Sequence, residues 1–148
     1  MAATYWSDVY PLIKAKLLTD LAALADTRGD PIFKQVYFGK KVQPKEFPCA
    51  IVRPEVIRPR VTTVRSSQYP MMFDIRAIAQ DTSPDLGDEE VITLLGRITK
   101  MFEDDRQWGG YAATTEVDDI IPEVDRPRVR TRFEGAVIVR FMRYVLPI

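Results

Sequence analysis

Residues 71–103 read MMFDIRAIAQDTSPDLGDEEVITLLGRITKMFE, and they pass from one hydrophobic period to another. Over 71–80 apolar side chains recur at every second position, as in a strand that buries one face and leaves the other wet. Over 84–103 they recur after three or four residues, as in an amphipathic helix. These residues therefore predict a strand with one wet face, followed directly by a helix.

Segments on both sides extend this pattern. Apolar positions at helical spacing predict a first helix over 8–25. Runs rich in β-branched and aromatic residues predict strands over 33–38 and 48–57 before the central strand, and over 115–124 and 129–146 after the second helix. The order α-β-β-β-α-β-β indicates an α+β fold, with one largely antiparallel sheet and two amphipathic helices packed on one face.

Prolines affect the predicted strand over 48–57. Pro54 and Pro59 lack the N–H group that a strand ladder uses. We therefore expect this strand to lie at a sheet edge or to end near Arg53.

The length of 148 residues fits a single domain over 1–148 with its own core. Residues 58–67 are polar and basic, which favours a protruding loop or hairpin arm. No apolar run reaches the roughly 20 residues that cross a bilayer, so we expect no membrane partner. The candidate contact residues of the arm are Arg58, Arg60 and Arg65.

The composition excludes much catalytic chemistry. The chain has no histidine and one cysteine, so Ser-His and Cys-His catalysis are excluded. Cys49 lies in an apolar run that is typical of a buried thiol rather than a nucleophile. The pair Gly109-Gly110 lacks the lysine of a phosphate-binding loop. We expect no enzymatic activity, no catalytic residues, and neither a metal nor a cofactor.

Charge is sorted by segment along the chain. Residues 81–125 carry 13 acidic and three basic side chains, a net charge of −10, whereas residues 1–80 and 126–148 each carry +5. The whole chain is neutral. Segments of opposite sign favour association with a second copy or with another partner through complementary fields.

Two charged clusters are candidates for such contacts. Three acids occupy 103–105, the negative end of the predicted second helix, where the helix dipole disfavours them and a cationic neighbour would stabilise them. Four arginines alternate along 126–132, and a hairpin of the last two strands would place them opposite the acidic residues 116–119. These charges fit a ladder within one hairpin, and they fit an interface between subunits equally well. The candidate interface residues are Glu103, Asp104, Asp105, Glu116, Asp118, Asp119, Arg126, Arg128, Arg130 and Arg132.

The layout of five segments carries a resemblance to a known family. The segments are an amphipathic helix near the N-terminus, the strands FPCAIV (47–52) and MFDIRAIA (72–79), the helical VITLL (91–95), and a closing strand through AVIV (136–139). Over nearly the whole chain, this layout resembles the tail terminator (tail completion) proteins of long-tailed phages. The resemblance implies a small α+β subunit that forms a hexameric ring on the end of the tail tube, halts its polymerisation and faces the head-side connector.

That role implies particular partners and a location. The expected partners are further copies of the chain, the tail-tube protein, and a head-side connector or neck protein, in a virion assembled in the host cytoplasm. A ring joins one face of a subunit to a different face of the next, and opposite charges favour that closure. We expect the arginines of 126–132 to meet the acids of 103–105 or 116–119 in the adjacent copy.

Other classes of protein remain open. Another neck or tail-tube protein of the same particle would share this layout. A nucleic-acid-binding protein would place Arg58, Arg60, Arg65 and the arginines of 126–132 on phosphates, but the neutral chain and its acidic segment argue against specific binding. An assembly adaptor would also fit the sequence. An enzyme would need a carboxylate pair or a lysine, and no spacing nominates one.

Overall fold

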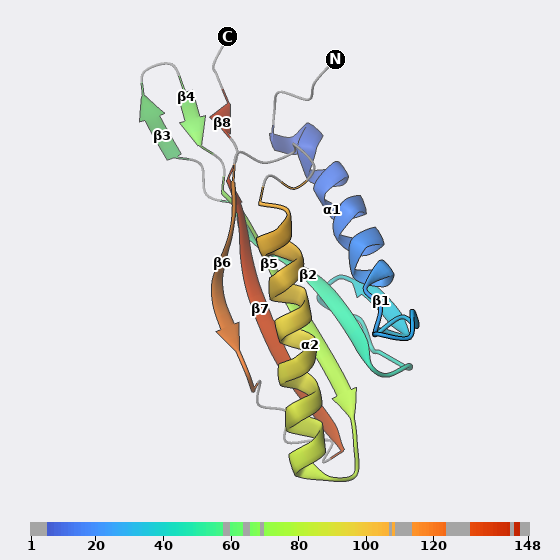
Figure 1. The fold of residues 1–148 in the computed structure, drawn as a ribbon. Helices are drawn as coiled ribbons and strands as arrows, with labels where there is room; N and C mark the ends of the chain where they lie inside the picture. Colours follow the sequence, from blue (N-terminus) through green and yellow to red (C-terminus); the bar gives the residue numbers. More distant parts are fainter. Residues whose placement is uncertain are drawn as a thin grey trace.

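The computed structural model describes residues 6–57, 60–63, 66–68, 70–106, 108, 114–123, 131–142 and 144–145. Within them, the elements follow one another from α1 to β8 (Figure 1). Their bounds are α1 Trp6–Ala23, β1 Gln35–Phe38, β2 Cys49–Ile57, β3 Arg60–Thr63, β4 Ser66–Gln68, β5 Met71–Gln80, α2 Pro84–Asp104, β6 Thr114–Ile121, β7 Arg132–Met142 and β8 Tyr144–Val145.

Five of the strands form the main sheet, in the order β1-β2-β5-β7-β6. β1 runs parallel to β2, and the other neighbours are antiparallel. The predicted α+β class with a largely antiparallel sheet is therefore confirmed. Among the described strands, β1 and β6 each pair on one side only and form the two edges of this sheet.

Three short strands, β3, β4 and β8, form a second sheet. β3 and β4 make an antiparallel hairpin within the segment predicted as a loop or hairpin arm, and β8 pairs with β4. Figure 1 shows this small sheet beyond one end of the main sheet. Arg60 begins β3, whereas Arg58 and Arg65 lie outside the described residues.

Both helices pack on one face of the main sheet and build the core with it. The hydrophobic stripe of α1 contributes Ile13 and Leu17, and α2 contributes Leu95 and Ile98, all at 2% exposure or less. Alternate residues of β5 and β7 complete the same cluster. Each helix thus covers the sheet with the apolar stripe that its sequence predicts.

The second face of the sheet is less wet than predicted. Ile78 on β5 is fully buried with Cys49 and Ile51 of β2, because Val42 and Phe47 from the segment before β2 pack over them. The prediction that Cys49 is a buried thiol is confirmed. No helix among the described residues is long and apolar enough to span a bilayer.

Candidate functional site

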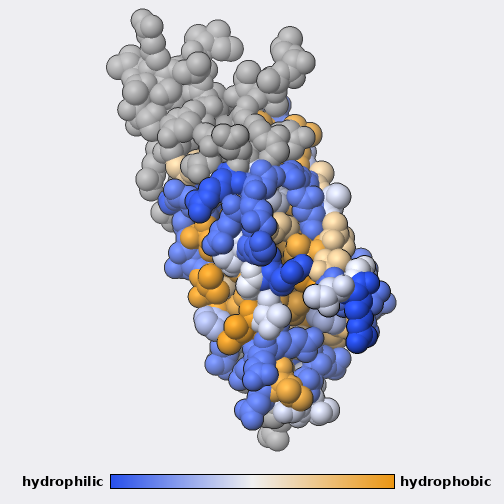
Figure 2. Space-filling view, in the orientation of Figure 1, coloured by the Kyte–Doolittle hydropathy of each residue, from blue (hydrophilic) through white to orange (hydrophobic). Residues whose placement is uncertain are grey.

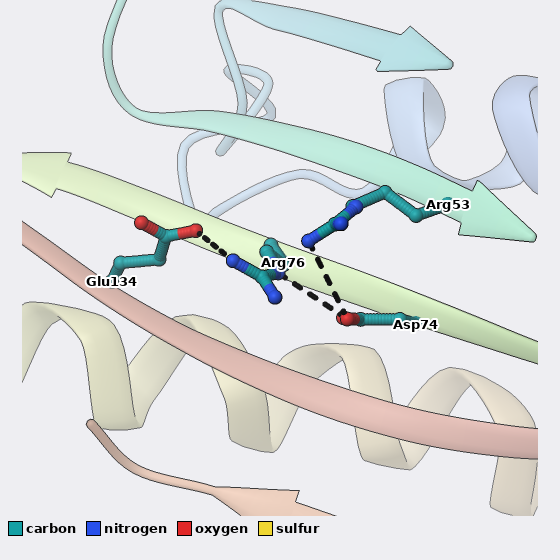
Figure 3. A network of polar contacts seen from close by, with 4 residues as sticks. All are labelled: Arg53, Asp74, Arg76 and Glu134. Atoms are coloured by element: carbon teal, nitrogen blue, oxygen red, sulfur yellow. Dashed lines mark hydrogen bonds and ion pairs between the residues drawn. The ribbon is translucent and has the colours of Figure 1, made fainter. Parts of the chain in front are cut away.

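A network of ion pairs crosses the middle of the helix-free face (Figure 3). Arg76 on β5 lies between two carboxylates: its Nη1 donates to Glu134 Oε1 at 3.0 Å and its Nε to Asp74 Oδ2 at 3.3 Å. Arg53 Nη1 on β2 lies 3.8 Å from the same Asp74 oxygen. Three neighbouring strands therefore contribute two arginines and two acids, whose charges cancel.

Burial explains why these four residues come as a set. Asp74 and Glu134 are each 3% exposed, and a buried carboxylate is costly unless a cation and hydrogen bonds compensate it. Burial alone would lower the pKa of Arg76, but the hydrogen bond to Glu134 and the negative charge of Asp74 hold that pKa above its ordinary value. Arg76 therefore stays charged between the two carboxylates and links β5 to β7.

A second charged site lies at the β6 edge, where a prediction proves wrong. The acids of 116–119 were expected opposite an arginine row, but Glu116 pairs across the ladder with Arg140 and Asp119 with Ile138. β6 pairs with the carboxyl-terminal part of β7, and the register shifts between Val117 and Asp119. The prediction paired β6 with residues too close to the amino-terminal end of the last strand.

Of the predicted arginine row, Arg132 is described, and Arg126, Arg128 and Arg130 lie outside the described residues. Arg132 begins β7 opposite Gln80 of β5, rather than opposite β6. Its guanidinium carbon lies 4.8 Å from the centroid of the Phe47 ring. This cation–π contact places Arg132 over the small apolar cluster on the helix-free face.

The acids at the end of α2 have cations within the same chain. Asp104 pairs with Lys100 at 3.3 Å, and Asp105 pairs with Lys16 of α1 at 3.4 Å. A hydrogen bond to Asp20 raises the pKa of Lys16, with Asp105 adding to the effect. The cationic neighbour expected for 103–105 therefore exists for two of the three acids, and Glu103 makes no ion pair with the rest of the described chain.

An open cleft of about 330 Å³ lies between the carboxyl-terminal end of α2 and β6. Its lining includes Glu103 from α2 and Glu116 from β6, whose carboxylate is bonded to Arg140 of β7. The remaining lining residues are Phe102, Arg106, Thr115 and Val117. Thr115 is 2% exposed, and its hydroxyl group has no hydrogen-bond partner among the described residues.

The two edges of the main sheet differ in charge. At the β6 edge, residues 114–123 carry four acids and no base, a net charge of −4. At the β1 edge, residues 34–46 carry four lysines and one glutamate, a net charge of +3. The side chains of these lysines are exposed: Lys34, Lys40, Lys41 and Lys45. The sequence analysis missed them, because counting charge over 1–80 averaged them with distant acids.

The β6 edge also exposes apolar surface. Ile120 and Ile121 are 50% and 39% exposed, next to the acids of the same strand. Figure 2 shows hydrophobic residues set among hydrophilic ones on the side of β6 and α2. An apolar centre with charged surroundings is the usual composition of a protein interface.

No group of three or more side chains suited to a metal ion occurs within the part of the chain that the structure describes. Comparison of the sequence with models of protein families and with curated proteins gives no match.

Proposed function

We propose that this chain is a structural virion protein, a tail terminator whose copies form a ring at the head-proximal end of a phage tail tube. In this role it stops polymerisation of the tube and joins the tail to the head connector. Its partners are further copies of itself, which together form a hexamer, the tail-tube protein, and a head-side connector or neck protein. The protein then belongs to the tail or neck of a virion that is assembled in the host cytoplasm.

The opposite charge of the two sheet edges is the observation that carries the proposal. The β6 edge is acidic and the β1 edge is basic, and four strand-to-strand steps separate them in the sheet. An isologous dimer would bring like charges together, which is unfavourable. A head-to-tail contact brings opposite charges together at every junction, and repetition of such a contact closes a ring when the rotation allows.

The free strand edge and its apolar residues support the same proposal. β6 pairs with β7 alone among the described strands, so its outer backbone groups are open to a neighbour. Ile120 and Ile121 add apolar area that a contact would remove from water. The charges then select the partner edge, and the isoleucines add affinity.

Native mass spectrometry at several salt concentrations, combined with negative-stain microscopy, tests the proposal. We expect one ring species whose population falls as salt rises, because salt screens the contacts between exposed charges. Added to polymerising tail tubes, the protein should limit tube length and appear at one tube end. A monomer at all salt concentrations that neither binds tubes nor changes their length would overturn the proposal.

A further inference from the structure

We propose that β6 of one copy pairs with β1 of the next copy in an antiparallel ladder, so that the main sheet continues from subunit to subunit. The inference rests on the proposed self-association and names the contact that forms each junction. Ile120 of one copy then lies opposite Phe38 of the next, and Ile121 lies opposite Tyr37. Figure 1 shows β6 and β1 at the two edges of the sheet, so every copy carries both contact surfaces.

Two rows of paired residues cross all five strands of the main sheet. Each row begins at an exposed isoleucine of β6 and ends at an aromatic residue of β1. One row runs from Ile121 through Ala136, Arg76 and Ile51 to Tyr37, and the other from Ile120 through Val137, Ile75 and Val52 to Phe38. A second copy placed level with the first continues both rows, which sets the register of the contact.

The direction of the ladder follows from the order of the strands. β1 is parallel to β2, and each later step, from β2 to β5, β7 and β6, is antiparallel. β1 and β6 therefore run in opposite directions. Copies related by rotation about an axis along the strands keep that difference, so the two edge strands meet antiparallel.

The backbone at both edges points outward at the required residues. The carbonyl oxygen of Ile121 points toward β7, since a Cβ on Gly135 of β7 would lie 3.0 Å from it. At the other edge, the N–H of Gly39 donates to a β2 carbonyl at 2.9 Å. Backbone groups of neighbouring strand residues point to opposite sides, so those of Ile120 and Phe38 face away from their own sheet. Facing each other, these two residues exchange two N–H···O bonds, the main source of affinity when a strand joins a sheet edge.

The side chains match on both faces of the sheet. Ile120 lies on the helix side, because its partner Val137 belongs to the core, and Phe38 packs against the same core. Ile121 and Tyr37 are each one residue away and lie on the other face. Each isoleucine thus meets an aromatic side chain, a favourable cross-strand pair that removes exposed apolar surface from water.

The charges on either side of the isoleucines select the β1 edge as the partner. In an antiparallel ladder the acids of 118–119 come to lie beside the exposed Lys40 and Lys41, and Glu123 comes toward the exposed Lys34. Two β6 edges would instead bring acids together, and two β1 edges would bring lysines together. Charges of this kind protect a strand edge from pairing with its own kind, and here they leave β6 with β1 as the favoured combination.

A proline at position 120 tests the backbone ladder. Ile120→Pro removes the outward N–H group and leaves the bonds of β6 to β7 in place. Association should weaken by about tenfold or more, because each junction loses a hydrogen bond and leaves a carbonyl unpaired. Ile120→Val keeps the N–H group and a β-branched side chain, so this matched control should associate nearly as well as the wild type. Native mass spectrometry over a dilution series measures association, and urea unfolding curves check that the subunits remain folded.

Charge exchange tests the direction of the ladder and does not depend on the proline variant. Lys40→Glu and Lys34→Glu should each weaken association by about fivefold, since like charges then meet. Asp119→Lys should restore association of the Lys40→Glu chain and not of the Lys34→Glu chain. Glu123→Lys should do the reverse. Each rescue is therefore the control for the other, and a parallel ladder would exchange the two pairs.

The outcomes separate this ladder from the proposed function. If the wild type forms rings and folded Ile120→Pro forms them equally well, the ladder is wrong and the ring stands. If the two rescues are exchanged, or neither occurs, antiparallel pairing of these edges is wrong. If the variants lose only tail-tube binding, the β6 edge receives the tube protein and the inference fails while the proposed function stands. If the wild type never associates, alone or on tubes, the proposed function fails and the ladder with it.

Discussion

Arg140 on β7 donates to Glu116 on β6 at 2.7 Å, directly across the strand ladder, and also lies 3.2 Å from Asp118. One guanidinium thus serves Glu116 and Asp118, which lie two residues apart on β6. Part of the acidic edge is therefore compensated within the subunit. The charge that remains for a neighbour comes from Glu103, Asp119 and Glu123, which make no ion pair within the described residues.

Replacing Arg140 with methionine should lower the free energy of unfolding by about 1 kcal/mol, because both pairs are partly exposed. The loss should shrink as salt rises, since salt screens the same charges. Urea unfolding at two salt concentrations measures it. Lys100→Met removes a more exposed pair within α2 and serves as the control, with a smaller expected loss. Equal losses for the two variants would contradict this reading of Arg140.

Removing Arg76 should be far more damaging, because it leaves Asp74 and Glu134 as buried acids that lack their shared cation. We expect Arg76→Met to destabilise the protein by about 3–5 kcal/mol. Glu134→Gln should cost less in the Arg76→Met background than in the wild type, and a double-mutant cycle by denaturant unfolding measures that coupling. Additive effects would show that the two side chains do not interact.

Gly135 and Gly96 make a matched pair for packing. A Cβ on Gly135 would lie 2.7 Å from Leu95 and 2.8 Å from Val91, so Gly135→Ala should destabilise the protein by about 1–3 kcal/mol. A Cβ on Gly96 meets nothing within 4 Å on the exposed side of α2. Gly96→Ala should stabilise the protein by up to about 1 kcal/mol, since alanine favours the helix. Thermal unfolding should show a lower midpoint temperature for Gly135→Ala and a higher one for Gly96→Ala than for the wild type.

Glu90 predicts a pH effect of defined sign. Burial, with the nearby charge of Asp81, raises the pKa of Glu90 above its ordinary value. The folded state then binds a proton more readily than the unfolded state, so the contribution of Glu90 to stability is present at low pH and is lost as pH rises through its folded-state pKa. Glu90→Gln should therefore be more stable than the wild type at neutral pH. The difference should vanish on acidification below the ordinary carboxyl pKa, as unfolding curves at several pH values measure, and a constant difference would contradict it.

The exposed isoleucines of β6 should matter for assembly and little for folding. Ile120→Ser with Ile121→Ser should reduce the ring population while leaving the unfolding midpoint of the subunit nearly unchanged. Leu12 on α1 is 41% exposed and lies outside β6, so Leu12→Ser is the control. Ring loss in the control would show that any exposed apolar residue has this effect.

The hydrophobic periods predicted the framework of the fold well. The strand over 71–80 has the predicted bounds, and α2 ends one residue after the predicted position. Both depend on short-range patterns that the chain carries locally. α1 begins and ends two residues earlier than predicted. The positions of its apolar residues do not show at which residue the last turn ends.

The pairing of strands was harder to predict. β2 neither forms an edge nor ends near Arg53, since it lies between β1 and β5 and continues to Ile57. Its register shifts between Pro54 and Val56, and β1 pairs only as far as Val52. A proline beyond the paired part of the strand therefore loses no ladder bond on that side. The place of β2 in the sheet and its register depend on contacts between residues far apart in the sequence.

The candidate site was predicted only in part. Glu103 and Glu116 were chosen from charge alone, and both line the open cleft. Their neighbours Arg106 and Thr115 were missed, because no local pattern places the end of α2 beside β6. Arg140 was missed as the partner of the acids for the same reason, since a shift of a few residues in strand register changes every pair.

Disulfide trapping tests the head-to-tail contact most directly. Cys49 is buried, so cysteines introduced at Lys40 and Asp119 are the exposed thiols of the described residues. We predict that Lys40→Cys chains mixed with Asp119→Cys chains form crosslinked heterodimers under mild oxidation, while a chain with both substitutions forms a ladder of crosslinked oligomers. Homodimers of either single variant, or no crosslinks in the mixture and in the double variant, would contradict a contact between the β1 edge of one copy and the β6 edge of the next.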